Sequence, residues 1–321
     1  MNRTCLCWMA LRLTATPLAC SEDAADTVDA AVDTDVAVDA DVAADADAAP
    51  AEDAAHDAPV PDTTQPAVFA AIPGARCTPG SRIGLVTVYA QGDGAAPLDA
   101  SAVLTDRVDP RMPQSPKLTD ASCEFFEQTP VPPCSPCPQG SMCTADGSCQ
   151  PLPVPAPDVT LVLQAGAASQ TLASNGSGSG AYGTVTLPGR TFSLQVKWAG
   201  RTVTLVDTTV PQAVADAAGK LLGSYDKPTG ADVTWTPAAQ GGTVFTHIPI
   251  NHHAGGATFT ECAVPASAGL LHVDGPMLTP LAVSTGLEFQ GIAHVRFAAA
   301  QTPDGCVEVR FQTSQFVSLG Y

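Results

Sequence analysis

Eight cysteines beyond residue 20 constrain the fold of this 321-residue chain more than any other sequence feature. The cytosol keeps thiols reduced, so this many cysteines predict an exported protein in which they form disulfides. Their even number allows every one of them to be paired. The eight are Cys77, Cys123, Cys134, Cys137, Cys143, Cys149, Cys262 and Cys306.

Half of these cysteines form a compact cluster with the spacing C-x2-C-x5-C-x5-C. With Gly140 and the turn at 145–147, the cluster resembles the small knots of EGF-like and related extracellular modules, in which pairing is interleaved. Spacing alone does not choose among the pairings, and a four-thiolate zinc site at the cluster is the competing hypothesis. The pairs that we expect are Cys134–Cys143, Cys137–Cys149, Cys77–Cys123 and Cys262–Cys306.

Alternating apolar and polar residues predict β-strands along most of the chain. Phe192, Leu194, Val196 and Trp198 alternate with polar residues, which is typical of a strand with one buried face, and the same pattern recurs at 306–313. Such strands, separated by frequent turns, favour a β-sandwich. We therefore predict a mainly β chain, with disulfide-stapled, β-sandwich-like domains after a disordered stalk. The predicted strands are 82–90, 98–108, 123–126, 159–164, 182–187, 192–198, 202–206, 231–236, 243–250, 292–298 and 306–313.

Two further structural expectations concern a helix and the aromatic side chains. Residues 211–222 are the one stretch where a helix is expected, although Gly219 weakens that prediction. The two tryptophans on apolar strand faces are expected in the core, and two tyrosines are expected at the surface. These aromatic residues are Trp198, Trp235, Tyr182 and Tyr321.

The first twenty residues resemble a lipoprotein signal peptide. A basic start at Arg3 is followed by an apolar stretch and by Leu18-Ala19-Cys20. The resemblance implies that Cys20 becomes the lipidated first residue of the mature protein. Simple cleavage of the signal is the alternative.

Residues 21–66 contain fourteen Asp and Glu residues and no Lys or Arg. This Asp/Ala/Val segment cannot bury enough apolar surface to offset its ordering, so it is predicted to be a disordered stalk. It carries most of the net charge of −18, and nucleic acid is excluded as a partner because no basic stripe is present. The predicted organisation is a signal at 1–20, a stalk at 21–66, a small β segment with the cysteine cluster at 67–157, and a β-sandwich-like domain at 158–321.

This layout, together with Val233-Thr-Trp235-Thr-Pro237 and the later Cys262, resembles surface lipoproteins of myxobacteria and related groups. The resemblance spans most of the chain, but its motifs are architectural. It implies a protein anchored in the outer membrane or at the cell surface by lipid. It implies no activity and no catalytic residues.

Few residues suggest chemistry. His247, His252 and His253 are the best candidate metal ligands, since imidazole suits zinc or copper. Ser224-Tyr-Asp-Lys227 matches the S-x-x-K box of penicillin-recognising enzymes, but Pro228 and Gly230 would end the helix that this box requires. We therefore expect neither catalysis nor a cofactor. The favoured function is a non-catalytic cell-envelope lipoprotein that makes structural or adhesive contact with a protein or polysaccharide; a metal-binding module and a secreted hydrolase are the alternatives.

Overall fold

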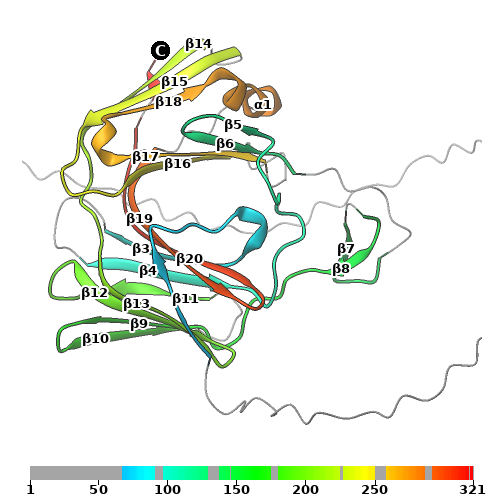
Figure 1. Cartoon of the computed structure of the whole chain (residues 1–321), viewed down its shortest axis with the longest axis vertical. Coiled ribbons are helices and arrows are strands. Elements are labelled where there is room, and N and C mark those ends of the chain that lie inside the picture. Colours follow the sequence, from blue (N-terminus) through cyan, green and yellow to red (C-terminus); the bar gives the residue numbers. More distant parts are fainter. Residues whose placement is uncertain are drawn as a thin grey trace, which may run out of the picture. The chain divides into compact units, whose positions relative to one another are not determined.

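A computed structural model of the chain describes residues 67–90, 97–128, 137–144, 146–174, 180–224, 227–249, 258–285, 291–317 and 319–320. These residues are mainly β-strands, as the sequence predicts (Figure 1). The strands form one ten-stranded sheet, here called the central sheet, a five-stranded lower sheet and a four-stranded upper sheet. The predicted signal, the stalk and Cys20 lie outside the described residues.

The central sheet contains strands from both ends of the described chain. The long strands β19 (Ile292–Thr302) and β20 (Gly305–Gln315) run through its middle and pair with each other antiparallel. On its other edge, β20 pairs in parallel with β3 (Arg82–Ala90). In order, its strands are β11 (Ala181–Val185), β4 (Leu98–Leu104), β3 (Arg82–Ala90), β20 (Gly305–Gln315), β19 (Ile292–Thr302), β16 (Thr243–Pro249), β17 (Phe259–Pro265), β6 (Cys123–Phe126) and β5 (Leu118–Thr119), while β2 (Ile72–Pro73) pairs with β19.

The other described elements form two smaller sheets, a hairpin and short helices. The lower sheet has the order β1 (Ala67–Ala70), β13 (Arg201–Thr209), β12 (Thr191–Trp198), β9 (Thr160–Ala165) and β10 (Ala168–Ala173). The upper sheet has the order β18 (Leu270–Asp274), β15 (Lys227–Thr236), β14 (Ala215–Ser224) and β21 (Leu319–Gly320). The remaining elements are the hairpin β7 (Ser141–Cys143) and β8 (Cys149–Pro151), α1 (Gly275–Thr285), and the 3-10 turns Pro79–Ser81 and Ala266–Ala268.

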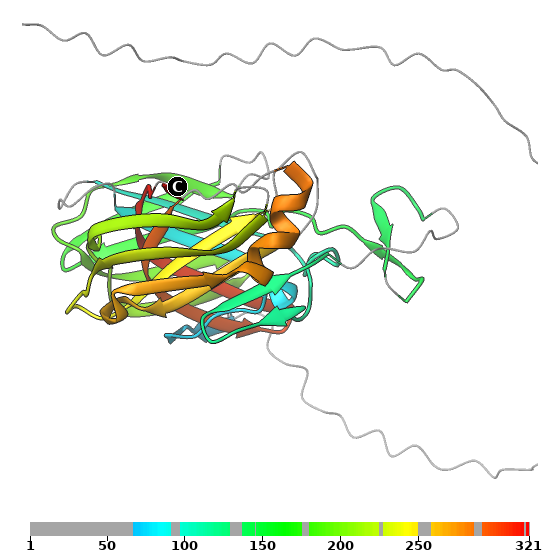
Figure 2. The same cartoon turned by 90° about the horizontal axis from the view of Figure 1, so that it is seen from above.

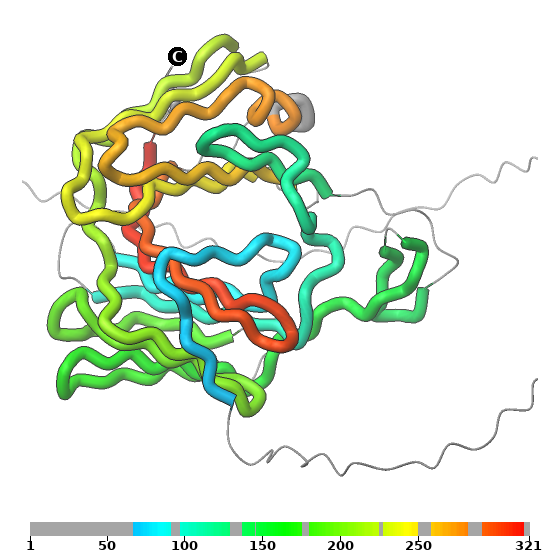
Figure 3. Tube along the Cα trace, viewed as in Figure 1, coloured from blue at the N-terminus to red at the C-terminus, as the bar shows by residue number. Residues whose placement is uncertain are grey.

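Two hydrophobic cores hold these sheets together. The lower sheet packs on one half of the central sheet, where Leu194 and Phe311 are among the buried residues. The upper sheet and α1 pack on the other half, around Trp235, Leu271 and Leu278. Figure 2 looks down onto the upper sheet, with α1 at one end. Because β19 contributes to both cores, one bent sheet is shared by two sandwich-like stacks (Figure 3).

Each of the eleven predicted strands overlaps an observed strand, but the prediction missed others, among them β10, β17 and β18. The predicted bounds 98–108 and 231–236 differ from β4 and β15 by four residues at one end.

The burial of β20 also differs from the expectation. A strand with alternating residues is expected to bury one face. In β20, however, Glu308 is fully buried and Arg310 almost so, as are the apolar neighbours Val307, Val309 and Phe311. Both faces of β20 are covered because the segment after β2 crosses the face opposite the cores.

The predicted helix at 211–222 is wrong, because this segment contains β14, which pairs along its length with β15. The described helix is α1, which the sequence analysis missed. Its Gly275, Pro276 and Pro280 are typical of a turn. Burial of Met277, Leu278 and Leu281 against the upper sheet outweighs that propensity.

Strand pairing crosses the domain boundary that the sequence suggests after residue 157. Strand β3 pairs with β20, and β4 pairs with β11. Both pairs join a strand from 67–157 to one from 158–321, so the central sheet contains residues from both predicted parts. Nothing in the local sequence signals these pairings, because they depend on contacts between residues far apart in the chain.

The disulfides connect the chain differently from the expected pattern. Cys137 pairs with Cys149 as predicted, and Cys143 is also disulfide-bonded, whereas Cys134 lies outside the described residues. The expected pairs Cys77–Cys123 and Cys262–Cys306 are wrong. Cys123 and Cys262 lie opposite each other on β6 and β17, so strand register decides their partnership. The observed long-range bonds are Cys77–Cys306 and Cys123–Cys262.

Candidate functional site

We call the face of the central sheet that points away from both cores its inner face. On β19, Ile292, Ala298 and Ala300 point toward the cores, whereas Val295 and Phe297 point to the opposite side. The chain after β2 crosses this inner face (Figure 1). Five charged residues meet there, and we call them the charge cluster: Arg76, Arg82, Glu261, Glu308 and Arg310.

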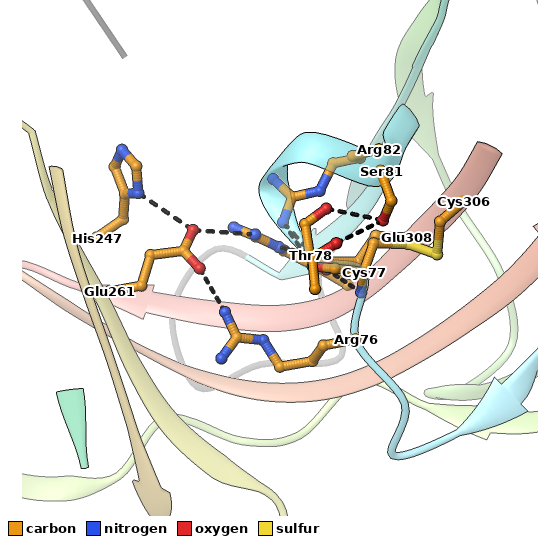
Figure 4. Close-up of polar contacts among 10 residues, drawn as sticks. Arg76, Cys77, Thr78, Ser81, Arg82, His247, Glu261, Cys306 and Glu308 are labelled. Carbon is orange, nitrogen blue, oxygen red and sulfur yellow. Dashed lines mark hydrogen bonds and ion pairs between the residues drawn. A yellow bond between two sulfur atoms is a disulfide. The ribbon is translucent and has the colours of Figure 1, made fainter. Parts of the chain in front are cut away.

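Glu308 lies at the centre of the charge cluster and is fully buried. Its carboxylate accepts hydrogen bonds from the Cys77 backbone N–H at 2.9 Å, Arg82 Nη2 at 3.2 Å and Arg310 Nε at 2.6 Å (Figure 4). A buried carboxylate is tolerated only when it is paired in this way. Because Cys77 is bonded to Cys306, the disulfide holds one of the three donors in place.

Glu261 is the second carboxylate, and its side chain is 3% exposed. It accepts a hydrogen bond from Arg76 Nη2 at 2.5 Å, and its Oε1 lies 3.3 Å from His247 Nδ1 and 3.7 Å from Arg310 Nη2. Burial alone would raise the pKa of Glu261, but the hydrogen bond with His247 and the neighbouring guanidinium groups outweigh it and lower the pKa to about 2. Glu261 is therefore ionised at neutral pH.

Two aromatic rings hold the guanidinium groups of the charge cluster. The Arg76 guanidinium carbon lies 5.1 Å from the Phe245 ring centroid and 4.9 Å from that of Phe297. Arg310 contacts the same two rings at 4.8 and 5.7 Å. These rings lie edge to face, with centroids 5.4 Å apart. Cation–π contacts add to the ion pairs and fix the planes of both arginines.

Two cavities border the charge cluster. One, of about 330 Å³, we call the basic cavity; its lining includes Arg310 and His247 and no Asp or Glu among the described residues. The other, of about 270 Å³, is lined by Arg76 together with Glu124 and Glu261. Arg310 is thus the one Arg or Lys in the described lining of the first cavity, whereas Arg76 and two glutamates line the second.

The charge cluster has more cationic than anionic groups. Three guanidinium groups face two carboxylates, so the cluster carries 3 − 2 = +1 in a chain whose net charge is −18. Such a local excess of positive charge, held rigidly and partly open to solvent, can bind an anionic or strongly polar group. Both carboxylates are paired with these arginines and hold them in position.

The predicted site residues are only partly brought together. His247 lies on β16 beside Glu261, and His252 and His253 are outside the described residues. Across the described ranges, no three His, Cys, Asp or Glu side chains are arranged to hold a metal ion. Ser224 ends β14 and is paired with Lys227 at the start of β15. The S-x-x-K residues thus lie in a β-hairpin and not on the helix that the penicillin-recognising enzymes use.

Sequence reasoning did not identify the charge cluster. Its members come from three distant segments; Arg76 lies between strands, and the other four look like ordinary polar residues on strands. The one available signal was the charged pair Glu308 and Arg310 on alternate positions of an otherwise apolar strand. The expected positions of Trp198, Trp235 and Tyr182 are confirmed, since the first two are buried and Tyr182 is exposed; Tyr321 lies outside the described residues.

A second ionic group lies on the upper sheet, around His272. Its Nδ1 lies 2.5 Å from Asp232 Oδ1, and its Nε2 lies 3.0 Å from Asp274 Oδ1. The hydrogen bond with Asp232 raises the pKa of His272 above its ordinary value; partial burial opposes this shift, and Asp274 adds to it.

The raised pKa predicts a pH dependence of stability. The protonated ring stabilises the fold below the unfolded-state pKa of about 6.5, and this contribution is lost as the pH rises through the higher folded-state value. We expect the urea midpoint of the wild type to fall more than that of His272→Gln between about pH 6 and about pH 9. Equal changes in the two proteins would show that His272 contributes no pH-dependent stability.

Comparisons with known proteins identify no family. No protein-family model matches the chain, and no curated protein matches it. Among solved structures, the FN1–FN3 domains of chicken CNTN1 share 8% identity over 78% of this chain and 67% of that chain, with a TM-score of 0.18. The BSP domain of a biofilm associated protein shares 15% identity over 53% of this chain and 27% of that chain, with a TM-score of 0.13. Likenesses this weak assign neither family nor function, and the resemblance to surface lipoproteins stays a prediction.

Within the described ranges, no helix is both long and apolar enough to cross a bilayer.

Proposed function

We propose that this protein is a non-catalytic, lipid-anchored component of the cell envelope, whose β module makes adhesive or structural contact with a protein or polysaccharide. The observation that carries the proposal is the inner face of the central sheet. It presents fixed cationic groups beside cavities, within a frame that two long-range disulfides hold together. A binding surface needs this kind of preorganisation, because ordering the groups on binding would cost affinity.

The paired state of the two carboxylates supports binding over catalysis. A general acid or base works best with a pKa near the operating pH. The low pKa of Glu261 keeps this carboxylate ionised, and Glu308 accepts three hydrogen bonds without contact with solvent. These groups are suited to holding arginines in position.

Export and anchoring belong to the same proposal. The disulfides Cys77–Cys306, Cys123–Cys262 and Cys137–Cys149 favour an oxidising compartment. An acidic stalk of 46 residues would span roughly 40 Å as a flexible chain, more with charge repulsion, and would hold the module away from a membrane. Lipid on Cys20 would supply the anchor.

Saturable binding to the protein's own cell envelope tests the proposed function. The intact chain, purified without reductant, is labelled and mixed with envelope fractions that contain polysaccharide or protein. We expect binding that His247→Ala combined with Gln312→Ala weakens at least about tenfold, or 1.4 kcal/mol. Val68→Ala is the matched control, since this exposed residue lies on β1 of the lower sheet, away from the inner face and the cavities described above. Absence of saturable binding to every fraction would contradict the proposal.

The non-reducing intact mass of the same preparation tests the anchor. A chain that begins at Cys20, carries lipid and lacks eight hydrogens would support lipidation together with four disulfides. A full-length chain with free thiols would contradict export. It would make a zinc site at the cysteine cluster the leading hypothesis.

A further inference from the structure

We propose that the basic cavity is a subsite for a carboxylate-bearing sugar of an acidic polysaccharide. This inference rests on the proposed binding function and names its ligand class. The cavity lies where β16, β19 and the end of β20 meet. Three independent features of its lining match the three parts of a uronic acid: the carboxylate, the hydroxyl groups and the apolar face of the sugar ring.

The carboxylate would be bound by Arg310 and His247. Arg310 directs Nε to Glu308 and Nη2 toward Glu261. Its Nη1 group makes no hydrogen bond with any residue that the structure describes, and the side chain is 11% exposed. His247 is 42% exposed and lines the same cavity. A guanidinium held in a fixed plane by aromatic rings is well suited to a carboxylate.

The acidity of the chain makes this site selective. Most of the net charge of −18 lies in the stalk, but residues 67–321 still carry 12 − 18 = −6, which repels a polyanion. Among the described residues, the lining of the basic cavity has no Asp or Glu, and Glu261, which contacts His247 and Arg310, is also paired with Arg76. Electrostatic complementarity of this kind contributes to specificity.

The hydroxyl groups would be bound by the polar side chains of the β20 end. Gln315 Nε2 donates to the Val214 carbonyl, which leaves Gln315 Oε1 as a buried acceptor without a donor among the described residues. A buried acceptor without a donor costs stability. Gln312 and Ser314 also line the cavity and are hydrogen-bonded to each other at 3.2 Å. Gln315 Oε1 itself is too buried to meet a ligand, but a sugar hydroxyl can accept a hydrogen bond from Gln312 or Ser314 and donate one to Gln312 Oε1.

The apolar ring face would stack on Phe316. This side chain is 80% exposed although it borders the cavity, and an exposed aromatic residue beside convergent polar groups is typical of a binding site. The residues before and after Phe316 fix its position in the chain. Val317 is buried, and the backbone of Gly291 passes close to Gln315. A Cβ on Gly291 would lie 2.1 Å from the Gln315 carbonyl oxygen, so glycine is required for this approach.

Calorimetric titration with defined oligosaccharides tests the subsite. The intact chain is titrated with a galacturonate tetramer and with the same tetramer after its carboxyl groups are reduced. We expect the acidic form to bind at least about tenfold more tightly, and Phe316→Ala to weaken its binding about tenfold. Phe316 is exposed, so its replacement should leave the urea midpoint unchanged. Val68→Ala is expected to bind like the wild type.

The outcomes separate this inference from the proposed function. Equal binding of the acidic and reduced tetramers, tighter binding of an acidic peptide such as poly-glutamate, or no effect of Phe316→Ala would overturn the subsite. No tetramer binding at all would also overturn it, while saturable binding to envelope fractions would still support the broader function. Loss of both would contradict the two proposals together.

Discussion

Replacing Glu308 with alanine is expected to lower the free energy of unfolding by about 3–5 kcal/mol. The substitution removes the acceptor for Arg82 and Arg310 and leaves the Cys77 backbone N–H without its partner. Two guanidinium groups then remain close to each other in a buried environment. Urea unfolding of the wild type and of Glu308→Ala, followed by tryptophan fluorescence, measures the difference.

A surface ion pair provides the matched control for this prediction. Glu127 pairs with Lys117, and both side chains are largely exposed. Glu127→Ala should change the free energy of unfolding by no more than about 1 kcal/mol, because water screens exposed pairs. A similarly small effect of Glu308→Ala would mean that the buried cluster tolerates the loss of its central carboxylate, contrary to our expectation.

Removing the Cys77–Cys306 disulfide is expected to lower the free energy of unfolding by about 3–5 kcal/mol. The two cysteines are 229 residues apart, so the bond restricts a long loop in the unfolded chain. Its loss also loosens the Cys77 N–H that binds Glu308. Unfolding of Cys77→Ser combined with Cys306→Ser, compared with the wild type without reductant, measures the effect.

The Cys137–Cys149 bond is the control for loop length. Its cysteines are 12 residues apart, and its removal should cost about 2–3 kcal/mol or less in the chain-entropy account. Because Cys77 and Glu308 are in contact, the effects of Cys77→Ser and Glu308→Ala should be non-additive. Strict additivity would show that the disulfide and the charge cluster act separately, and an equal effect of both disulfides would contradict the dependence on loop length.

The strands were predictable because their signal is local. Alternation of apolar and polar residues placed β3, β12 and β20 within one or two residues of their observed bounds. The missed helix α1 and the mistaken helix at 211–222 have one cause. In both segments tertiary packing outweighs local propensity, through burial of the α1 face and pairing of β14 with β15.

The candidate site could not be predicted in the same way. Arg76, Glu261 and Arg310 are separated by long stretches of sequence, and only the crossing of the inner face brings them together. His247 attracted attention as a metal ligand. In the structure it lies beside a carboxylate that two arginines also contact, which favours a role in polar binding.

The sequence by itself determined that the chain is mainly β, the approximate positions of eleven strands, and that its cysteines form disulfides. These properties depend on residue type and local periodicity. Only the tertiary structure decided which strands are neighbours, that Cys77 pairs with Cys306 and Cys123 with Cys262, and that three arginines converge on two buried glutamates. Those properties depend on strand order and register, which are set by the packing of residues that are distant in sequence. No single segment of the sequence therefore predicts them.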